Sequence, residues 1–468
     1  DAQESRGLGD VYKRQMNTTR TISLKSWRGL VLLALAAAVL PSARAALPIA
    51  HWQQPSGAQV YFVQSPALPM VQVQIDFDAG SRRDPPALKG LADATAGMAS
   101  KGVREEAGQP ALDENQLGEA WADLGAGFGA SATADRTSYE LRTLTEPRLL
   151  DAAVALAARQ LARPSFAPSV WQREREQWTS ALREAETRPG THASRAFRQA
   201  VYADHPYGQA ETPETLQRIG TASMQAFHER YIVPCRAKVS VVGAVDRAQA
   251  DAIVRRLLAG LDARREASCA GLPDIAPVAP LAQAVRRDIR FDSAQAQVLI
   301  GQPGIARSDP DYFALTAGNY VLGGGGFVSR LMQEVREKRG LTYGISSSFS
   351  PALQAGPFAV ALQTRPDQAA QALDVATGVI RDFVAQGPTP EELQAAKDNL
   401  IGGFPLRLDS NAKLLANVAN IAWNGLPLDY LETWTDQIAR LTADDVRAAF
   451  QRHLQPDRMV TVTVGAQP

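Results

Sequence analysis

Apolar and polar side chains alternate strictly along residues 71–80, VQVQIDFDAG. The apolar positions of this run are Val71, Val73, Ile75 and Phe77. A period of two is typical of a β-strand, and the polar positions between them predict a strand with one buried face. Residues 138–161, SYELRTLTEPRLLDAAVALAARQL, pass from alternation into a helical pattern, which predicts a strand followed by an amphipathic helix.

The same order of elements recurs in the second half of the chain. AQAQVLIGQPG (294–304) is followed by a helical stretch and by PFAVALQTRPDQAAQALDVATGVI (357–380). The two halves also end alike, in FHERYIVPCRAKVSVVG (227–243) and FQRHLQPDRMVTVTVG (450–465). Such self-similarity indicates one structural plan used twice.

Each copy mixes strands with long helices, so we predict an α+β fold. The expected architecture is two homologous domains, each an antiparallel sheet covered by helices, that face each other across a cavity. Two domains stacked without a cavity are the alternative. The domains are expected at residues 46–265 and 286–468. Residues 266–285, rich in alanine and proline, are expected to form an extended linker because proline stiffens the chain and removes hydrogen-bond donors.

The first forty-five residues are set apart from this plan. Residues 1–15 contain DVYKRQ, which resembles a translated sequencing adapter, although a short native tail is the alternative. Residues 16–45 have a basic start, the short apolar run GLVLLALAAAVL and a small-x-small end at Ala43-Arg44-Ala45. This layout predicts a secretory signal peptide and a periplasmic protein without stable membrane insertion after cleavage, with a retained anchor as the alternative.

Charge and cysteine content exclude few classes of function. Lysine plus arginine and aspartate plus glutamate both number 49, and no basic block stands out, which argues against a nucleic-acid partner. The two cysteines, Cys235 and Cys269, do not make a disulfide framework, and their spacing leaves open whether they pair.

IDFDAGSRRDPPALKGLADATAGMASKGV (75–103) resembles the opening of the insulinase/pitrilysin metallopeptidases, the inverzincins. HPYG (205–208) and LGGGGFVSRLMQEVREKRGLTYG (322–344) extend the resemblance, which covers essentially the whole chain after the signal peptide. In that family the first helix carries H-x-x-E-H, two zinc-binding histidines and a catalytic glutamate on one helical face. The resemblance therefore implies a zinc peptidase fold.

The zinc motif itself is degenerate in this chain. The flanking Gly-Leu-Ala and Lys-Gly place Asp93 and Gly97 at the two histidine positions and Ala96 at the glutamate position. Glu174 falls at the spacing of the third family ligand, although a surface charge is an equally good interpretation. A zinc peptidase needs several protein ligands and a carboxylate base for the bound water. Neither imidazole is present, Ala96 offers no base, and Glu174 even with Asp93 is a poor zinc site, so we expect no metal or other cofactor here. The five histidines offer no pair at helical ligand spacing, and His205 in HPYG is expected in a structural turn.

Two residues of the family's second half are retained. EVREKRGLTYG matches the segment in which an arginine and a tyrosine reach the active site, here Arg336 and Tyr343, with Gly340 permitting the turn between them. The resemblance implies that arginine holds a substrate carbonyl and tyrosine stabilises the oxyanion. The alternative is an ordinary helix end with Arg336 paired to Glu337 or Glu334. The glycines at 323–326 fit either a flexible loop or a tight helix start against the sheet.

GAGFGASATADRTSY (125–139) corresponds to the family's edge strand, on which an extended peptide pairs by β-augmentation. The expected substrate-binding residues are Phe128, Gly129, Ala130 and Ser131. Gly129 stands where active relatives commonly carry asparagine. Main-chain pairing needs no particular side chain, so peptide binding is compatible with this change.

The resulting hypothesis is a non-zinc subunit of a periplasmic heterodimeric peptidase. A zinc-bearing insulinase-family partner would supply the metal site, and this chain would supply Arg336 and Tyr343. The alternative from another class is a catalytically inactive scaffold or peptide-binding protein of the same fold. An active enzyme with a displaced metal site is the third and weakest possibility.

Overall fold

The computed structural model describes residues 48–106, 108–264, 269 and 271–467. The predicted signal peptide and the adapter-like segment therefore lie outside the described residues. No helix within the described part is both long enough and apolar enough to cross a bilayer.

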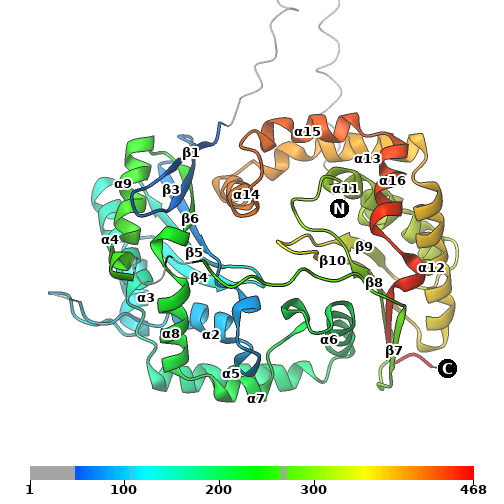
Figure 1. Cartoon of the computed structure of the whole chain (residues 1–468), viewed down its shortest axis with the longest axis horizontal. Helices are drawn as coiled ribbons and strands as arrows, with labels where there is room; N and C mark the ends of the chain where they lie inside the picture. The colour runs from blue at the N-terminus through cyan, green and yellow to red at the C-terminus, as the bar shows by residue number, and fades with distance from the viewer. Residues whose placement is uncertain (1–47, 107, 265–268, 270, 468) are drawn as a thin grey trace, which may run out of the picture. The chain divides into compact units, whose positions relative to one another are not determined.

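The strands are β1 Ala50–Gln53, β2 Gln59–Gln64, β3 Met70–Phe77, β4 Gly127–Ala132, β5 Thr137–Leu144, β6 Lys238–Gly243, β7 Val285–Ile289, β8 Ala296–Pro303, β9 Ile345–Phe349, β10 Pro357–Thr364 and β11 Val460–Val464. The helices are α2 Leu91–Met98, α3 Glu114–Asp123, α4 Pro147–Ala162, α5 Pro168–Ala185, α6 Pro189–Tyr202, α7 Pro213–Arg218, α8 Thr221–Tyr231, α9 Arg247–Leu258, α11 Tyr312–Asn319, α12 Ala369–Gln386, α13 Pro390–Gly402, α14 Asn411–Asn424, α15 Tyr430–Arg440 and α16 Ala443–His453 (Figure 1).

The strands form two sheets with the same order. The first sheet runs β1-β2-β6-β3-β5-β4 and the second runs β7-β11-β8-β10-β9, so every strand of the second has a counterpart in the first. This confirms the α+β prediction of two copies of one plan. The sheets are not wholly antiparallel, because β2 pairs in parallel with β6 and β7 pairs in parallel with β11. In each copy the last strand, β6 or β11, follows a long helical segment of the chain. Such a long connection allows it to pair in parallel with the early strand β2 or β7.

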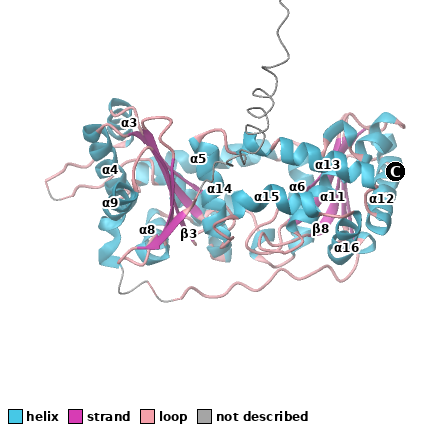
Figure 2. Ribbon diagram, turned by 90° about the horizontal axis from the view of Figure 1, so that it is seen from above, coloured by secondary structure: helices cyan, strands magenta, loops and turns pink. Residues whose placement is uncertain are grey.

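The predicted alternation of β3 is present, but both faces of the strand are buried. Val71, Val73, Ile75 and Phe77 are at most 1% exposed and pack against the helices that cover one face. The polar positions Gln72, Gln74 and Asp76 are also at most 9% exposed. α14 lies over this second face, opposite α4 and α9 (Figure 2). The expectation of a solvent-facing polar side was wrong because the covering helix comes from the other half.

The two halves exchange one helix each. α6 belongs to the first half in sequence, yet it packs on β8 and β11 of the second sheet (Figure 1). Its Phe197 and Val201 share an apolar cluster with Val460 and Val462 of β11. Conversely, α14 of the second half packs on β2, β3 and β6 of the first sheet. Each sheet therefore completes its packing with a helix from the other copy.

The described part of the linker runs without helix or strand from Gly271 to Ala284 and is fastened to the first half. Cys235 and Cys269 form a disulfide at its start. Farther along, the Arg83 guanidinium donates to the carbonyl of Pro273, and the carbonyl of Ala276 lies 3.0 Å from Nε2 of His205. Nδ1 of His205 accepts the amide of Tyr207 at 3.1 Å, which agrees with the structural role expected for HPYG.

We predict that replacing both Cys235 and Cys269 by serine destabilises the protein by about 2–3 kcal/mol, because the closed loop no longer restricts the unfolded chain. The sulfur atoms span a sequence separation of 34 residues. Urea unfolding of the double variant measures the loss. The oxidised wild type treated with a reductant is the matched comparison, and an unchanged midpoint in both would contradict the prediction.

Candidate functional site

α2 carries the degenerate motif, and a buried carboxylate fixes where this helix begins. Asp84 is 4% exposed and accepts the amides of Gly90 at 2.9 Å, Leu91 at 3.2 Å and Ala92 at 2.9 Å. Gly90 adopts φ +96°, a left-handed conformation that disfavours other residues. Three helix-start donors are thereby satisfied, so the helix is rigidly placed although it has lost the ligands it would present.

The side chains at positions 93, 96 and 97 do not form a set of metal ligands. Ala96 is 1% exposed and carries only a methyl group, while Asp93 is partly buried. A Cβ built on Gly97 would already contact the Trp178 ring at 3.7 Å. Near this helix, Glu174 is the remaining match to the family's ligands.

Glu174 is committed to two cations. Its Oε1 lies 2.7 Å from Nη2 of Arg173 and 3.3 Å from Nζ of Lys101. Both cations also pair with Glu114, and these contacts hold the pKa of Glu114 below its usual value. The cluster Lys101, Glu114, Arg173 and Glu174 is therefore a charge-balanced network. A zinc ion would meet one engaged carboxylate and two positive side chains, so these residues do not fit zinc.

Asp93 titrates differently from an exposed carboxylate. Burial, reinforced by the neighbouring Glu211 carboxylate, raises the pKa of Asp93 to about 6. The folded state thus binds this proton more tightly than the unfolded chain, and its stabilising effect is lost as the pH rises from about 4 through about 6.

We predict that Asp93→Asn removes this pH dependence. Between pH 4 and pH 7 the wild type should lose about 2 kcal/mol of unfolding free energy relative to Asp93→Asn. Urea unfolding of both proteins at several pH values measures the difference. Burial also raises the pKa of Asp84, and the Asp93 carboxylate raises it further, so Asp93→Asn removes that smaller contribution as well. Parallel curves would contradict the assignment.

Arg336 and Tyr343 flank a tight turn in the second half. Arg336 lies in a π-helical segment, Met332–Glu337, and Gly340 has φ +63°, as a turn out of the helix requires. Nη1 of Arg336 lies 3.0 Å from Oε1 of Glu337, and its guanidinium lies 4.7 Å from the centroid of the Phe327 ring. The helix-end pairing considered from the sequence is therefore present.

Tyr343 is 87% exposed, and its hydroxyl has no hydrogen bond within the described part of the chain. It lines a cavity of about 550 Å³ together with Gly190 and Ser194 of α6 and Gln297 of β8. Arg336 does not line this cavity.

The glycine-rich segment beside Arg336 is partly a close-packing device. A Cβ on Gly323 would lie 2.5 Å from Oγ and 2.6 Å from the amide of Ser347 on β9. Gly326 has φ +64° and open space around it. The tight-packing interpretation therefore holds at Gly323, and the turn follows at Gly326.

β4, which contains the expected substrate-binding residues, is the last strand of the first sheet. Phe128 is 8% exposed and stacks between Trp121 and Tyr139 in the core. Its side chain therefore does not face a ligand. Gly129, Ala130 and Ser131 line a cavity of about 490 Å³ with β5 and Leu415 of α14. An outermost strand of this kind has unpaired main-chain groups on its outer side.

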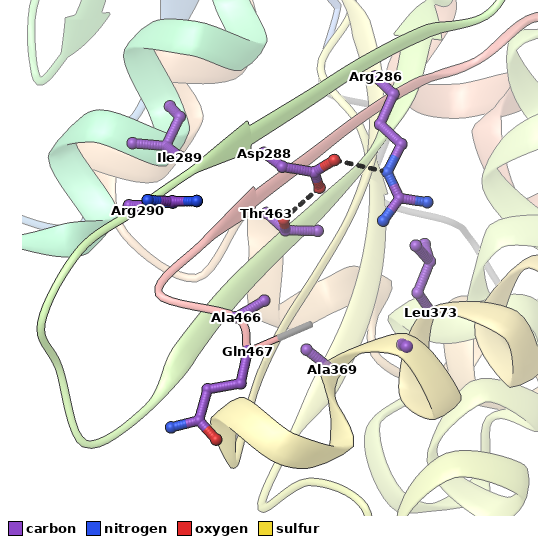
Figure 3. Close-up of a pocket in the computed structure, with 10 residues that line it drawn as sticks. Arg286, Asp288, Ile289, Arg290, Ala369, Leu373, Thr463, Ala466 and Gln467 are labelled. Atoms are coloured by element: carbon purple, nitrogen blue, oxygen red, sulfur yellow. Dashed lines mark hydrogen bonds and ion pairs between the residues drawn. The ribbon is translucent and has the colours of Figure 1, made fainter.

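Other concave or acidic sites contain none of these residues. A cavity of about 330 Å³ lies beside β7, β11 and the start of α12 (Figure 3). There Asp288 is already engaged by Arg286 at 2.8 Å and Thr463 at 2.6 Å. Within the described residues, Asp309, Asp311 and His453 are the group close enough to hold a metal, but Arg452 forms a two-bond ion pair with Asp311.

The sequence already indicates that Glu174 is a helix-surface charge near basic neighbours, and the structure pairs it with one of them, Arg173. The additional contact with Lys101 was not predicted. Arg173 stands directly before Glu174, which was a local signal. The approach of Lys101 and Glu114 depends on tertiary packing, for which the sequence offered no periodic cue.

The sequence and the fold match known proteins along most of the chain. Residues 59–212 match the insulinase (peptidase family M16) model, and residues 218–400 match the peptidase M16 inactive domain. A crystal structure of a peptidase M16 inactive domain from Pseudomonas fluorescens is 34% identical, with a TM-score of 0.84, and covers 90% of this chain and 98% of that one. The chain belongs to the insulinase family of peptidases, family M16.

Two curated insulinase-family relatives differ in what their names imply. An uncharacterized zinc protease of Streptomyces coelicolor is 27% identical over 84% of both chains. A non-peptidase homolog of Helicobacter pylori is 24% identical over 85% of this chain and 89% of that one. The match of residues 218–400 to the peptidase M16 inactive domain groups this protein with the inactive-type homologues of the insulinase family.

The fold also matches half of a longer insulinase-fold protein. The periplasmic protease PqqL of Escherichia coli has a TM-score of 0.76 at 18% identity, over 90% of this chain but 46% of that chain. At this identity the match concerns the fold alone. It means that the two-sheet unit seen here is about half of PqqL.

Proposed function

We propose that this protein is the non-zinc subunit of a heterodimeric, periplasmic peptidase of the insulinase family. Its partner is a second insulinase-family chain that carries H-x-x-E-H and the third glutamate. This chain contributes the Arg336–Tyr343 segment and the β4 edge, and the partner contributes the zinc ion with its bound water. The observation that carries the proposal is the contrast between a dismantled zinc site and an exposed Tyr343.

The state of Tyr343 supports a role toward a group outside this chain. A tyrosine that served only packing would bury its ring, yet this side chain is 87% exposed and its hydroxyl has no hydrogen bond within the described residues. A phenol in that state is free to donate to an oxyanion on a substrate. Arg336 is held by a single partly exposed ion pair with Glu337, which costs little to exchange for a substrate carbonyl.

The fold match to PqqL is compatible with a partner of the same fold, since the unit described here matches 46% of that longer chain. In our proposal a second chain of the family supplies the other unit and its own zinc site. The ion pairs of Glu174 with Lys101 and Arg173 support placing the metal in that chain, because they engage the remaining carboxylate at the family's ligand positions here.

The test is co-expression with the product of a neighbouring zinc-motif gene, followed by co-purification and a peptide-cleavage assay. We expect a complex whose cleavage is abolished by a chelator, with stoichiometric zinc in the partner and none in this chain purified alone. Absence of a complex would contradict the proposal, and chelator-sensitive cleavage by the isolated chain would as well. A complex that cleaves equally well without Arg336 and Tyr343 would favour the scaffold alternative.

A further inference from the structure

The face of the first sheet beside β4 carries charged side chains with empty space next to them. Glu140 and Arg142 of β5 are exposed, and their cross-strand partners on β4 are Gly129 and Gly127. Cross-strand partners project from the same face of a sheet. A Cβ on either glycine would meet no atom within 4 Å. The edge strand therefore raises no side-chain wall between these two charges and the open side of the sheet.

These residues line a defined cavity rather than a flat surface. Its volume is about 490 Å³, and Leu415 of α14 forms part of its wall. Gln72, on β3 opposite Arg142, also lines it and is 9% exposed. Oε1 of Gln72 is buried without a hydrogen-bond partner among the described residues. A buried acceptor in that state is costly unless a ligand or water supplies a donor.

The charged groups of Glu140 and Arg142 have no ion-pair partner among the described residues. The nearby Asp76, in contrast, is paired with Arg136 at 3.0 Å. The groove thus offers one negative and one positive group at positions two residues apart on one strand. Extended peptides place alternate side chains on one face, with the same two-residue period.

We infer that the groove selects, in a peptide paired antiparallel to β4, a basic residue followed two positions later by an acidic one. This inference rests on the proposed function in taking an extended peptide along β4 as the ligand, and it adds the charge register. In the antiparallel direction the residue opposite Gly129 precedes the residue opposite Gly127. The first faces Glu140 and the second faces Arg142, which defines the order Lys-x-Glu.

The distances allow these contacts. An added strand lies two strand spacings, about 10 Å, from β5. Lysine or arginine on the peptide and Glu140 on β5 can span this gap together because Gly129 between them has no side chain. The same holds for an acidic residue and Arg142 across Gly127. Main-chain bonds to β4 supply affinity, and the charge pairs supply direction and register.

The test uses the isolated full-length chain and two fluorescent decapeptides of identical composition that differ only in a central Lys-x-Glu or Glu-x-Lys. By fluorescence anisotropy we expect the Lys-x-Glu peptide to bind about tenfold more tightly, with the difference shrinking at high salt. The double variant Glu140→Arg/Arg142→Glu should reverse the order. The exposed pair Glu119→Arg/Arg218→Glu is the matched control and should leave it unchanged.

Equal affinities for the two peptides, or a preference that the charge exchange does not reverse, would overturn the inference. The measurement needs neither partner nor zinc, so it separates the two proposals. If this chain discriminates between the two peptides but no complex cleaves peptides, only the heterodimeric function is contradicted. If a complex cleaves peptides but this chain binds both peptides equally, only the charge register is contradicted.

Discussion

Arg336→Ala and Tyr343→Phe should each lower kcat of the heterodimer by about 100- to 1,000-fold. Tyr343→Phe removes a donor to the developing oxyanion, and Arg336→Ala removes the charged contact to the substrate carbonyl that becomes this oxyanion. Tyr343→Phe deletes a single oxygen from an 87% exposed side chain, so the fold and the complex should persist. KM should change far less than kcat, because contacts made mainly in the transition state raise kcat selectively.

Two matched controls separate chemistry from structure. Arg339→Ala removes a neighbouring exposed arginine that pairs with Glu334 at 2.7 Å, and Tyr61→Phe removes a phenol oxygen from the first sheet. Both should retain wild-type kcat. Steady-state kinetics on one peptide substrate, with the amount of complex measured by size exclusion, provides the comparison. Equal kcat values for all four variants would assign Arg336 and Tyr343 to structure alone.

Restoring the motif by Asp93→His, Ala96→Glu and Gly97→His should not by itself create a tight zinc site. Glu174 stays bound to Lys101 and Arg173, and the imidazole introduced at 97 packs beside the Trp178 ring. Adding Lys101→Ala and Arg173→Ala should raise the zinc affinity at least about hundredfold, because two nearby positive charges no longer oppose the cation and Glu174 becomes available.

Competition with a chromogenic chelator measures the two zinc dissociation constants. The control adds Lys338→Ala and Arg339→Ala to the same triple variant, since these residues form an equivalent pair of contacts with Glu334 in the second half. That control should bind zinc no better than the triple variant. Tight zinc binding by the triple variant alone would show that the charge network does not block the site.

Much of the fold could be predicted from the sequence because its signals are local. The alternation in β3 and β8 and the matching ends before β6 and β11 each depend on adjacent residues, and the structure places them as counterparts. The exchange of α6 and α14 could not be predicted in the same way. An amphipathic helix requires an apolar surface, but its own pattern does not say which sheet provides it.

The candidate site could be predicted from the sequence only in part. Motif register identified the loss at Asp93, Ala96 and Gly97, and the matching segment identified Arg336 and Tyr343. The core position of the Phe128 ring and the contact of the Arg336 guanidinium with the Phe327 ring could not be predicted, because both depend on tertiary packing. The cavity beside Gly127 and Gly129 likewise emerges only when β4, β5 and α14 come together.

The crossing of α6 and α14 also constrains how such a chain could have arisen. A single ancestral copy whose helix covered the sheet of another copy would leave its own sheet bare as a monomer. Such an ancestor would have existed as a symmetric pair with reciprocal helices. Fusion of the two genes would then preserve an existing interface. Cleavage of the present linker should yield two fragments that are soluble only when they associate.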